Sequence, residues 1–350
     1  MKIIVENKIP YIREAIEQVT SDVVYLPAAE FTRDSVKDAD VLIIRTRVKC
    51  DKNLLEGSSV KFIATATIGF DHIDTAYCDK AGIIWKNAPG CNSNSVKQYV
   101  EAAIILCALH YNLQLSSLTL GVIGVGHVGE KIVELGKSFG MRVLQNDPLR
   151  AVNEENFTSV SISTIAEQAD IITFHVPLST SGYHATYHLA NSNFFNQLTK
   201  KPILINTSRG EVVDTMALTR ALDKGLIRNV VIDVWENEPC IDKNLLSRAF
   251  ITTPHIAGYS ADGKCLAAQM SLQAISDFYN LKLDIKILPP SLVDNRLMSI
   301  NASNYNEAVL KIYNPLIDSE LLKENPDQFE SFRGNYYLRR EPSAFNIIIE

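Results

Sequence analysis

A glycine-rich turn between an apolar run and a helix-like stretch constrains this chain more than any other feature. The glycines follow a G-x-G-x-x-G pattern over residues 124–129, directly after the apolar residues 118–123. Helical spacing of apolar residues continues to residue 139, and Asp147 ends the next strand-like run. Such a turn lets a pyrophosphate reach a helix N-terminus, and the acidic residue can accept hydrogen bonds from ribose hydroxyls. The pattern predicts a dinucleotide site, and we expect NAD.

Short apolar runs alternate with helix-like or loop-like stretches along most of the chain. This alternation is typical of parallel βα units whose sheets are covered on both faces. The fold class expected is therefore α/β, with two doubly wound parallel sheets. The first 90 residues contain no such glycine pattern, so the first of the two sheets should bind something other than the dinucleotide. The expected strands are residues 2–5, 23–26, 41–46, 62–67 and 83–86, then 118–123, 142–145, 171–175, 203–206, 230–234 and 250–253.

The length of 350 residues favours more than one domain. A helix-like stretch at residues 92–111 is expected to cross from the first domain to the second, and another at 260–280 to return. Pro289-Pro290 marks a further break. We expect domains at residues 1–93 with a return segment at 256–281, at 94–255, and a small α+β segment at 282–350.

Composition narrows the class of protein. A net charge of −6 gives no basic stripe for nucleic acid. The longest apolar stretch, near residues 102–109, is far shorter than the roughly 20 residues that cross a bilayer. The six cysteines show no C-x-x-C spacing. We therefore expect no nucleic-acid or membrane partner, no metal site, and reduced thiols in a cytoplasm.

Three polar residues each follow a different expected strand: Arg209, Glu238 and His255. The carboxyl ends of parallel strands meet at one edge of a sheet, so these side chains are expected to share a cleft. An arginine suits a substrate carboxylate, a histidine exchanges protons near neutral pH, and a carboxylate orients an imidazole. Glu236 is an equally acidic neighbour of Glu238, and Arg209 by itself also fits a surface turn.

The segments that carry these residues resemble the active-site blocks of the D-2-hydroxyacid dehydrogenases. The blocks are residues 206–214, 233–239 and 253–258, and the similarity spans about residues 40–280. In that family an arginine binds the substrate carboxylate, a histidine moves the hydroxyl proton and a glutamate supports the histidine. The resemblance implies Arg209, Glu238 and His255 as catalytic residues.

Other details resemble the branch of that family that oxidises 4-phospho-D-erythronate with NAD in pyridoxal 5′-phosphate (vitamin B6) biosynthesis. They lie at residues 45–46, 64–72, 255–260 and 332–340. The resemblance implies a homodimer formed through residues 282–350 and a substrate-binding role for the first domain. It implies substrate contacts at Thr46, Thr67 and Tyr259, and NAD contacts at Gly124, Gly126, His127, Val128, Gly129, Asp147, Thr207, Ser208, Arg209, Asp233 and Gly258.

The substrate phosphate needs cationic or hydroxyl partners, because a buried dianion without them is costly. Arg45 follows the expected strand at 41–46 and is our expected phosphate contact. Arg333, Arg339 and Arg340 of the tail could reach the phosphate or serve only a dimer contact.

Two alternatives to this function stay open. One is another enzyme of the same family, of the phosphoglycerate or glyoxylate/hydroxypyruvate type, because few residues decide substrate choice there. The other is a dinucleotide-sensing protein that has kept the fold and lost turnover. The three intact polar residues Arg209, Glu238 and His255 argue against a sensor.

Overall fold

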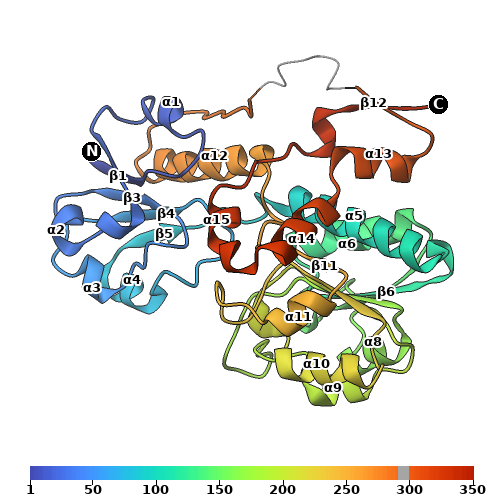
Figure 1. The fold of residues 1–350 in the computed structure, drawn as a ribbon. Coiled ribbons are helices and arrows are strands. Elements are labelled where there is room, and N and C mark those ends of the chain that lie inside the picture. The colour runs from blue at the N-terminus through green and yellow to red at the C-terminus, as the bar shows by residue number, and fades with distance from the viewer. Residues whose placement is uncertain (291–298) are drawn as a thin grey trace. The chain divides into compact units, whose positions relative to one another are not determined.

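The structure is a computed structural model that describes residues 1–290 and 299–350. The chain divides into two compact units (Figure 1). One contains Met1–Asn92 and Ser260–Val293, and the other contains Ser93–Tyr259 and Asp294–Glu350. Of the expected segment at 282–350, residues 282–290 lie in the first unit and residues 299–350, here called the C-terminal segment, lie in the second.

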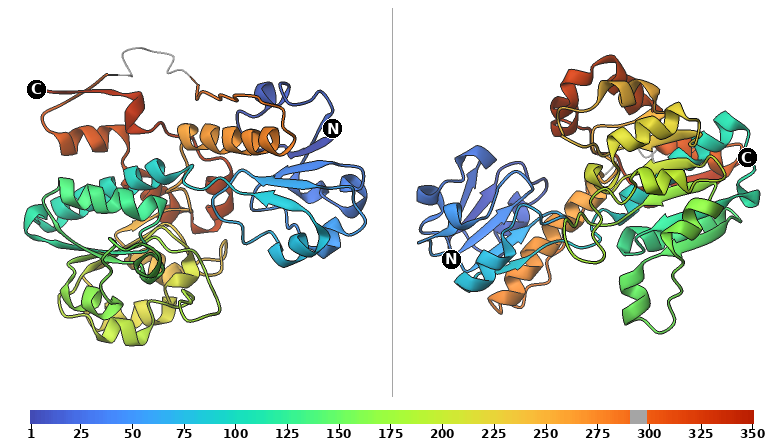
Figure 2. Two further views of the ribbon diagram at one scale, coloured as in Figure 1. Left: turned by 180° about the vertical axis from the view of Figure 1, so that it is seen from behind. Right: turned by 90° about the horizontal axis from the view of Figure 1, so that it is seen from below.

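The first unit is built on a parallel sheet with the strand order β2-β1-β3-β4-β5. Hydrophobic side chains form one core cluster on each face of the sheet, and helices cover both faces (Figure 2). Its strands are β1 (Ile3–Glu6), β2 (Val23–Leu26), β3 (Val41–Ile44), β4 (Phe62–Thr65) and β5 (Ile84–Lys86), and its helices are α1 (Arg13–Ile16), α2 (Arg33–Val36), α3 (Lys52–Leu55), α4 (Thr75–Ala81) and α12 (Ala261–Phe278).

The second unit contains a six-stranded parallel sheet in the order β11-β10-β9-β8-β6-β7. The order reverses between β6 and β8, which is where ligands bind in doubly wound folds. Its strands are β6 (Thr119–Ile123), β7 (Arg142–Asn146), β8 (Ile171–Phe174), β9 (Ile203–Asn206), β10 (Asn229–Ile232) and β11 (Ile251–Thr252). Its helices up to residue 248 are α5 (Ser93–Tyr111), α6 (His127–Ser138), α7 (Pro148–Asn153), α8 (Ile162–Gln168), α9 (Ser192–Asn196), α10 (Thr215–Asp223) and α11 (Lys243–Arg248).

The C-terminal segment adds a small parallel pair of strands and three helices to the second unit. They are β12 (Ser299–Ala302), α13 (Tyr305–Ile312), α14 (Pro315–Glu324), α15 (Phe329–Gly334) and β13 (Asn346–Ile349). Leu322 and Phe329 are buried in the same core cluster as side chains of the six-stranded sheet. The Ser319 hydroxyl accepts a hydrogen bond from the Thr252 N–H at 2.9 Å. These buried contacts explain why the segment is not a separate unit.

The expected fold class is confirmed: two doubly wound parallel sheets with a small C-terminal α+β segment. β3 and β4 end earlier than expected, because the chain leaves the sheet at Ile44 and Thr65. Within the described residues, no helix is long and apolar enough to cross a membrane.

Two adjacent leucines of α14 test how firmly this segment is joined to the core. Leu322 is fully buried and Leu321 is 44% exposed. Leu322→Ala should lower the free energy of unfolding by about 3 kcal/mol, because it leaves a cavity in a packed core. Leu321→Ala should cost well under about 1 kcal/mol.

Chemical denaturation at several protein concentrations measures both variants and separates unfolding from any dissociation. Equal losses for the two variants would contradict the buried packing of α14.

Candidate functional site

The turn between β6 and α6 is shaped for close approach of a ligand. Gly124 has a φ of 85°, and a Cβ there would lie 2.6 Å from the carbonyl oxygen of His175. A Cβ on Gly129 would lie 2.0 Å from the carbonyl oxygen of Gly124. A Cβ on Gly126 would meet no atom within 4 Å, so the space in front of that residue is open. Glycine is therefore required at residues 124 and 129 by the turn itself, and Gly126 faces open space.

The first turn of α6 offers backbone donors to that open space. Gly126 is the N-cap and makes no side-chain capping bond, and His127 is exposed in the first turn. The first N–H groups of a helix have no partner within the helix, and the helix dipole favours an anion there. His127, Val128 and Gly129 thus present the arrangement that a pyrophosphate needs.

Asp147 lies at the end of β7 and is tied to the glycine turn. Its Oδ2 accepts from the Val125 N–H at 2.9 Å, and its Oδ1 accepts from the Arg150 N–H at 3.0 Å. The Arg150 guanidinium pairs with Glu130 at 2.7 Å and with Glu154 at 2.5 Å. Two carboxylates therefore offset the charge of Arg150, a cation that could attract a further phosphate.

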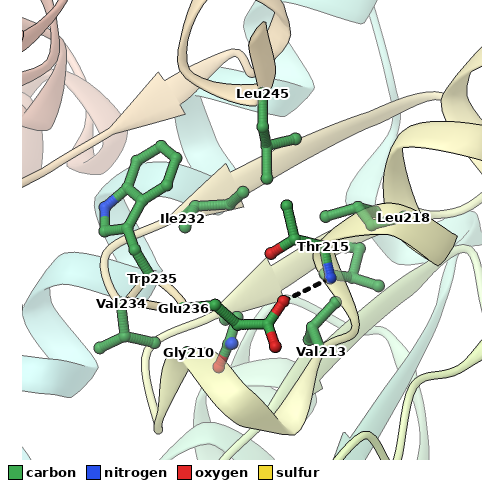
Figure 3. A pocket seen from close by; sticks show the side chains of 11 residues that line it. Gly210, Val213, Thr215, Leu218, Ile232, Val234, Trp235, Glu236 and Leu245 are labelled. Carbon is green, nitrogen blue, oxygen red and sulfur yellow. Dashed lines mark hydrogen bonds between the residues drawn. The ribbon is translucent and has the colours of Figure 1, made fainter. Parts of the chain in front are cut away.

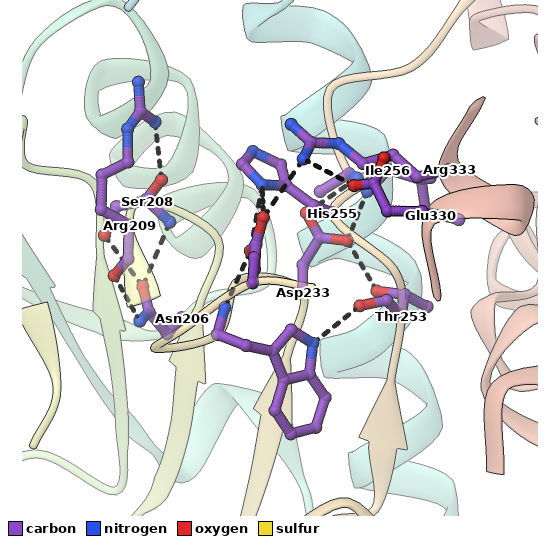
Figure 4. A network of polar contacts seen from close by, with 12 residues as sticks. Asn206, Ser208, Arg209, Asp233, Thr253, His255, Ile256, Glu330 and Arg333 are labelled. Carbon is purple, nitrogen blue, oxygen red and sulfur yellow. Dashed lines mark hydrogen bonds and ion pairs between the residues drawn. The ribbon is translucent and has the colours of Figure 1, made fainter. Parts of the chain in front are cut away.

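His255 and Glu238 form a hydrogen-bonded pair beyond β10 and β11 (Figure 4). The Nδ1 atom of His255 lies 2.8 Å from Oε2 and 3.1 Å from Oε1 of Glu238. The Trp235 N–H also donates to Oε1 of Glu238, at 3.0 Å. The contact with Glu238 orients the imidazole through Nδ1. It leaves Nε2 as the ring atom suited to exchange a proton with a substrate.

The buried carboxylate of Asp233 holds the loop that carries His255. Asp233 is 1% exposed, and its Oδ1 accepts from the Thr253 hydroxyl and the Ile256 N–H, each at 2.7 Å. Its Oδ2 accepts from the Ala257 N–H at 2.9 Å. Burial raises the pKa of Asp233 and outweighs the lowering by His255 and these donors. Asp233 acts on the imidazole through the backbone of this loop.

The electrostatics of Glu238 involve a residue of the C-terminal segment. Burial by itself would raise the pKa of Glu238, but the hydrogen bond and charge of His255, the Trp235 N–H and the charge of Arg333 outweigh it, so the pKa is lowered. Nη1 of Arg333 lies 3.3 Å from Oε2 of Glu238. The sequence offered Arg333 only as a tail cation, and no local pattern indicated this contact.

Glu236 has other partners, so the geometry distinguishes it from Glu238. Its Oε1 lies 2.6 Å from Nε2 of His188, and its Oε2 accepts from the Thr215 N–H at 2.8 Å. It lines a small, mostly apolar pocket beside β9 and β10 (Figure 3). This pocket is not lined by His255 or Glu238, so it lies apart from the proton-transfer pair.

Arg209 follows β9, and Glu238 lies on the loop that follows the neighbouring strand β10. Its Nη1 donates to the Ser208 carbonyl at 2.8 Å, and its own carbonyl accepts from the Asn206 amide at 2.9 Å. The Ser208 hydroxyl donates to Oδ1 of Asn206 at 2.8 Å. The Thr207 hydroxyl oxygen is buried and has no hydrogen-bond partner among the described residues. A buried polar atom of this kind is suited to a bound ligand.

Arg45, Thr46 and Thr67 lie in the first unit, just past β3 and β4. The Arg45 guanidinium forms a two-point ion pair with the buried Glu6, through Nε to Oε2 and through Nη2 to Oε1 at 3.0 Å. The Thr67 hydroxyl donates to the Gly69 carbonyl at 2.8 Å, and Thr46 is exposed. The pair with Glu6 offsets the charge that Arg45 was expected to offer.

Gly258 and Tyr259 follow the His255 loop in the second unit. Both are half-buried, and the Tyr259 ring lies 6.2 Å, centre to centre, from the ring of Tyr336. No group of three or more metal-ligating side chains occurs among the residues that the structure describes.

Comparison with known proteins places this site in a family. Residues 97–257 match the model of the D-isomer specific 2-hydroxyacid dehydrogenase, NAD binding domain. The erythronate-4-phosphate dehydrogenase of Bacteroides thetaiotaomicron is 54% identical and covers 99% of both chains. That of Porphyromonas gingivalis is 42% identical over 99% of this chain and 95% of its own.

A solved structure has the same fold over most of the chain. The D-lactate dehydrogenase from Aquifex aeolicus complexed with NAD and lactic acid matches with a TM-score of 0.67 at 26% identity, covering 83% of this chain and 100% of that one. Together with the relatives that match over the full length, this shows that the chain belongs to the erythronate-4-phosphate dehydrogenases of the D-isomer specific 2-hydroxyacid dehydrogenase family.

Proposed function

We propose that this protein oxidises 4-phospho-D-erythronate to 3-hydroxy-2-oxo-4-phosphooxybutanoate with NAD, as a step of pyridoxal 5′-phosphate biosynthesis. The observation that carries the proposal is the hydrogen-bonded pair of His255 and Glu238, in a chain 54% identical to an erythronate-4-phosphate dehydrogenase over its full length. NAD, when bound, supplies the acceptor for the hydride that leaves C2 of the substrate.

The residues of this chain bind the substrate and move its proton. Arg209 binds the substrate carboxylate, because a guanidinium matches both of its oxygens. His255 receives the proton of the 2-hydroxyl group at Nε2, and Glu238 keeps the ring oriented through Nδ1. The protein therefore contributes position and charge to the oxidation.

The cofactor contacts follow the geometry of the second unit. The first turn of α6 holds the pyrophosphate, and Asp147 accepts from the ribose hydroxyls. The buried Thr207 hydroxyl, with Ser208 and Arg209, contributes on the next loop. The remaining contacts are Asp233 and Gly258.

Substrate recognition away from the reacting carbon falls to Thr46, Thr67, Tyr259 and Arg45. Because Glu6 offsets the charge of Arg45, we expect this arginine to donate hydrogen bonds to the phosphate without supplying net charge. The two threonines lie at the carboxyl ends of neighbouring strands, where a ligand of a parallel sheet is expected.

The first test compares three variants of the acidic and basic residues. His255→Asn should lower kcat by roughly a hundredfold or more, since general base catalysis contributes about that much. Asparagine is chosen because His255 has a φ of 58°, which asparagine tolerates. Glu238→Gln should lower kcat less, and Glu236→Gln, the matched control, should leave kcat near wild type.

The rates are measured from NADH formation, with 3-phosphoglycerate and glycolate as competing substrates. NAD binding, followed by fluorescence, should persist in all three variants. Faster turnover of either competing substrate by the wild type would contradict the proposed substrate.

The second test concerns cofactor choice. NAD should be preferred over NADP by kcat/KM, because Asp147 repels a 2′-phosphate and Arg150 is already paired with Glu130 and Glu154. Asp147→Asn removes the charge but keeps a side-chain oxygen that can cap α7 by accepting from the Arg150 N–H. This variant should lower the ratio of kcat/KM with NAD to kcat/KM with NADP. An unchanged ratio would show that Asp147 does not select the cofactor.

We also propose a cytoplasmic homodimer formed through residues 282–350. In the part of this region that belongs to the second unit, large apolar side chains are exposed, among them Tyr337 at 81% and Ile317 at 68%. Such exposure is typical of an interaction surface when the side chains are contiguous. Cys50, Cys78, Cys107 and Cys240 form no disulfide, which suits a reducing compartment.

Matched substitutions of exposed residues test the dimer. Ile317→Glu, on α14, should shift the sedimentation coefficient toward the monomer, because a charge in an apolar interface is costly. Met216→Glu, on α10 and equally exposed at 69%, should leave the dimer intact. A dimer that survives substitution of both Ile317 and Tyr337 would place the interface elsewhere.

A further inference from the structure

The C-terminal segment brings an arginine, Arg333, to the His255–Glu238 pair. Nη1 of Arg333, on α15, lies 3.3 Å from Oε2 of Glu238, the oxygen that also contacts His255 (Figure 4). The Arg333 side chain is only 18% exposed and that of Glu238 17%. At this burial, solvent screens the ion pair much less than it screens a surface pair.

The other neighbours of Arg333 are Glu330 and Tyr259. Its Nη1 lies 3.8 Å from Oε1 of Glu330. Burial by itself would lower the pKa of Arg333, but its interactions with Tyr259, Glu238 and Glu330 outweigh this and raise the pKa. The guanidinium is therefore a permanent positive charge between the supporting carboxylate and the tyrosine that follows the His255 loop.

A further arginine of the same segment anchors the backbone of that loop. Arg339 is 5% exposed and donates to the carbonyls of Ile256 at 3.0 Å and Ala257 at 2.5 Å. It also donates to the Ser95 carbonyl and to Oε1 of Gln98, each at 3.0 Å. The loop is thus held by Asp233 through its N–H groups and by Arg339 through its carbonyls.

We propose that Arg333 is a positioning residue for proton transfer, which keeps Glu238 ionised and directed at Nδ1 of His255. This inference depends on the proposed function only for the identity of the reaction. It assigns to the C-terminal segment a role in the active site of its own chain, besides any role in dimer formation. Arg333 acts through Glu238 and does not touch the reacting atoms.

The charges around the pair determine the sign of the expected effect. His255 faces Glu238 and Asp233, Glu238 faces His255 and Arg333, and Arg333 also faces Tyr259 and Glu330. Oxidation requires an unprotonated imidazole, so kcat/KM falls on the acidic side as the His255–Glu238 pair takes up a proton. Removing a positive charge beside the pair favours proton uptake and moves this acidic limb to higher pH.

The experiment compares charge loss with charge retention at position 333. Arg333→Gln should move the acidic limb of kcat/KM upward by about 0.5 to 1 pH unit and lower kcat several-fold, as expected for a charge at this range. Arg333→Lys should restore most of the wild-type kcat and most of the wild-type position of the acidic limb. Arg248→Gln, which breaks the pair of Arg248 with Asp223 at 2.8 Å, is the matched control and should leave the limb in place.

A second variant keeps the test valid if Arg333→Gln does not fold. Glu330→Gln removes a partly exposed negative charge near Arg333, so the limb should move slightly to lower pH, opposite to the first variant. A measurement without turnover uses protein with ¹³C-labelled histidine. The His255 resonance, assigned by its loss in His255→Asn, should titrate with midpoints that shift in the same directions.

The possible outcomes separate this inference from its alternatives. An unchanged limb and His255 titration in Arg333→Gln would overturn it. If KM rises only for phosphorylated substrates, while the acidic limb and the His255 titration stay unchanged, Arg333 is instead a phosphate contact. If the wild type fails to oxidise 4-phospho-D-erythronate, the proposed function is wrong, and the titration of His255 still decides the role of Arg333.

Discussion

The hydrogen bonds between the buried carboxylate of Asp233 and the loop that carries His255 are the interaction on which the site depends most. The carboxylate accepts three hydrogen bonds from this loop, and the His255 N–H in turn donates to the Asp233 carbonyl at 2.8 Å. These bonds are formed away from water and compensate the cost of burying a polar group. They hold His255 at a positive φ that most residues avoid, and so direct its ring at Glu238.

Parallel strand order explains why residues far apart in the chain share this edge of the second unit. β9, β10 and β11 are neighbours in the sheet, and Arg209, Glu238 and His255 follow them in that order. The order reverses beside β6, where the glycine turn and the N-terminus of α6 lie. One edge therefore presents the N-terminus of α6 and the His255–Glu238 pair, the groups to which we assign phosphate binding and proton transfer.

The C-terminal segment is a structural part of the second unit. It contributes Leu322 and Phe329 to the core, and Arg333 and Arg339 to the surroundings of Glu238 and the His255 loop. If the segment also forms the dimer contact, association and proton transfer depend on different residues of the same segment. A change in the dimer interface would then alter the contact of Arg333, on α15, with Glu238.

The glycine pattern, the apolar strands and the active-site blocks were legible in the sequence because each is a local signal. They correctly indicated two parallel sheets and an NAD-binding domain, and they indicated polar residues that follow β9, β10 and β11. Local signals also misled in one respect, since the strands expected to reach Thr46 and Thr67 end at Ile44 and Thr65. The chain leaves the sheet there, although Thr46 and Thr67 are β-branched and Ala66 is apolar.

The choice of partner for each charged side chain was decided only by tertiary structure. Local chemistry does not distinguish Glu236 from Glu238, yet Glu236 meets His188 and Glu238 meets His255. Arg333 is 95 residues from Glu238 in the chain, and nothing near either residue predicts their contact. The physical reason is that short-range patterns specify the backbone, whereas an ion pair depends on which distant segments the core brings together.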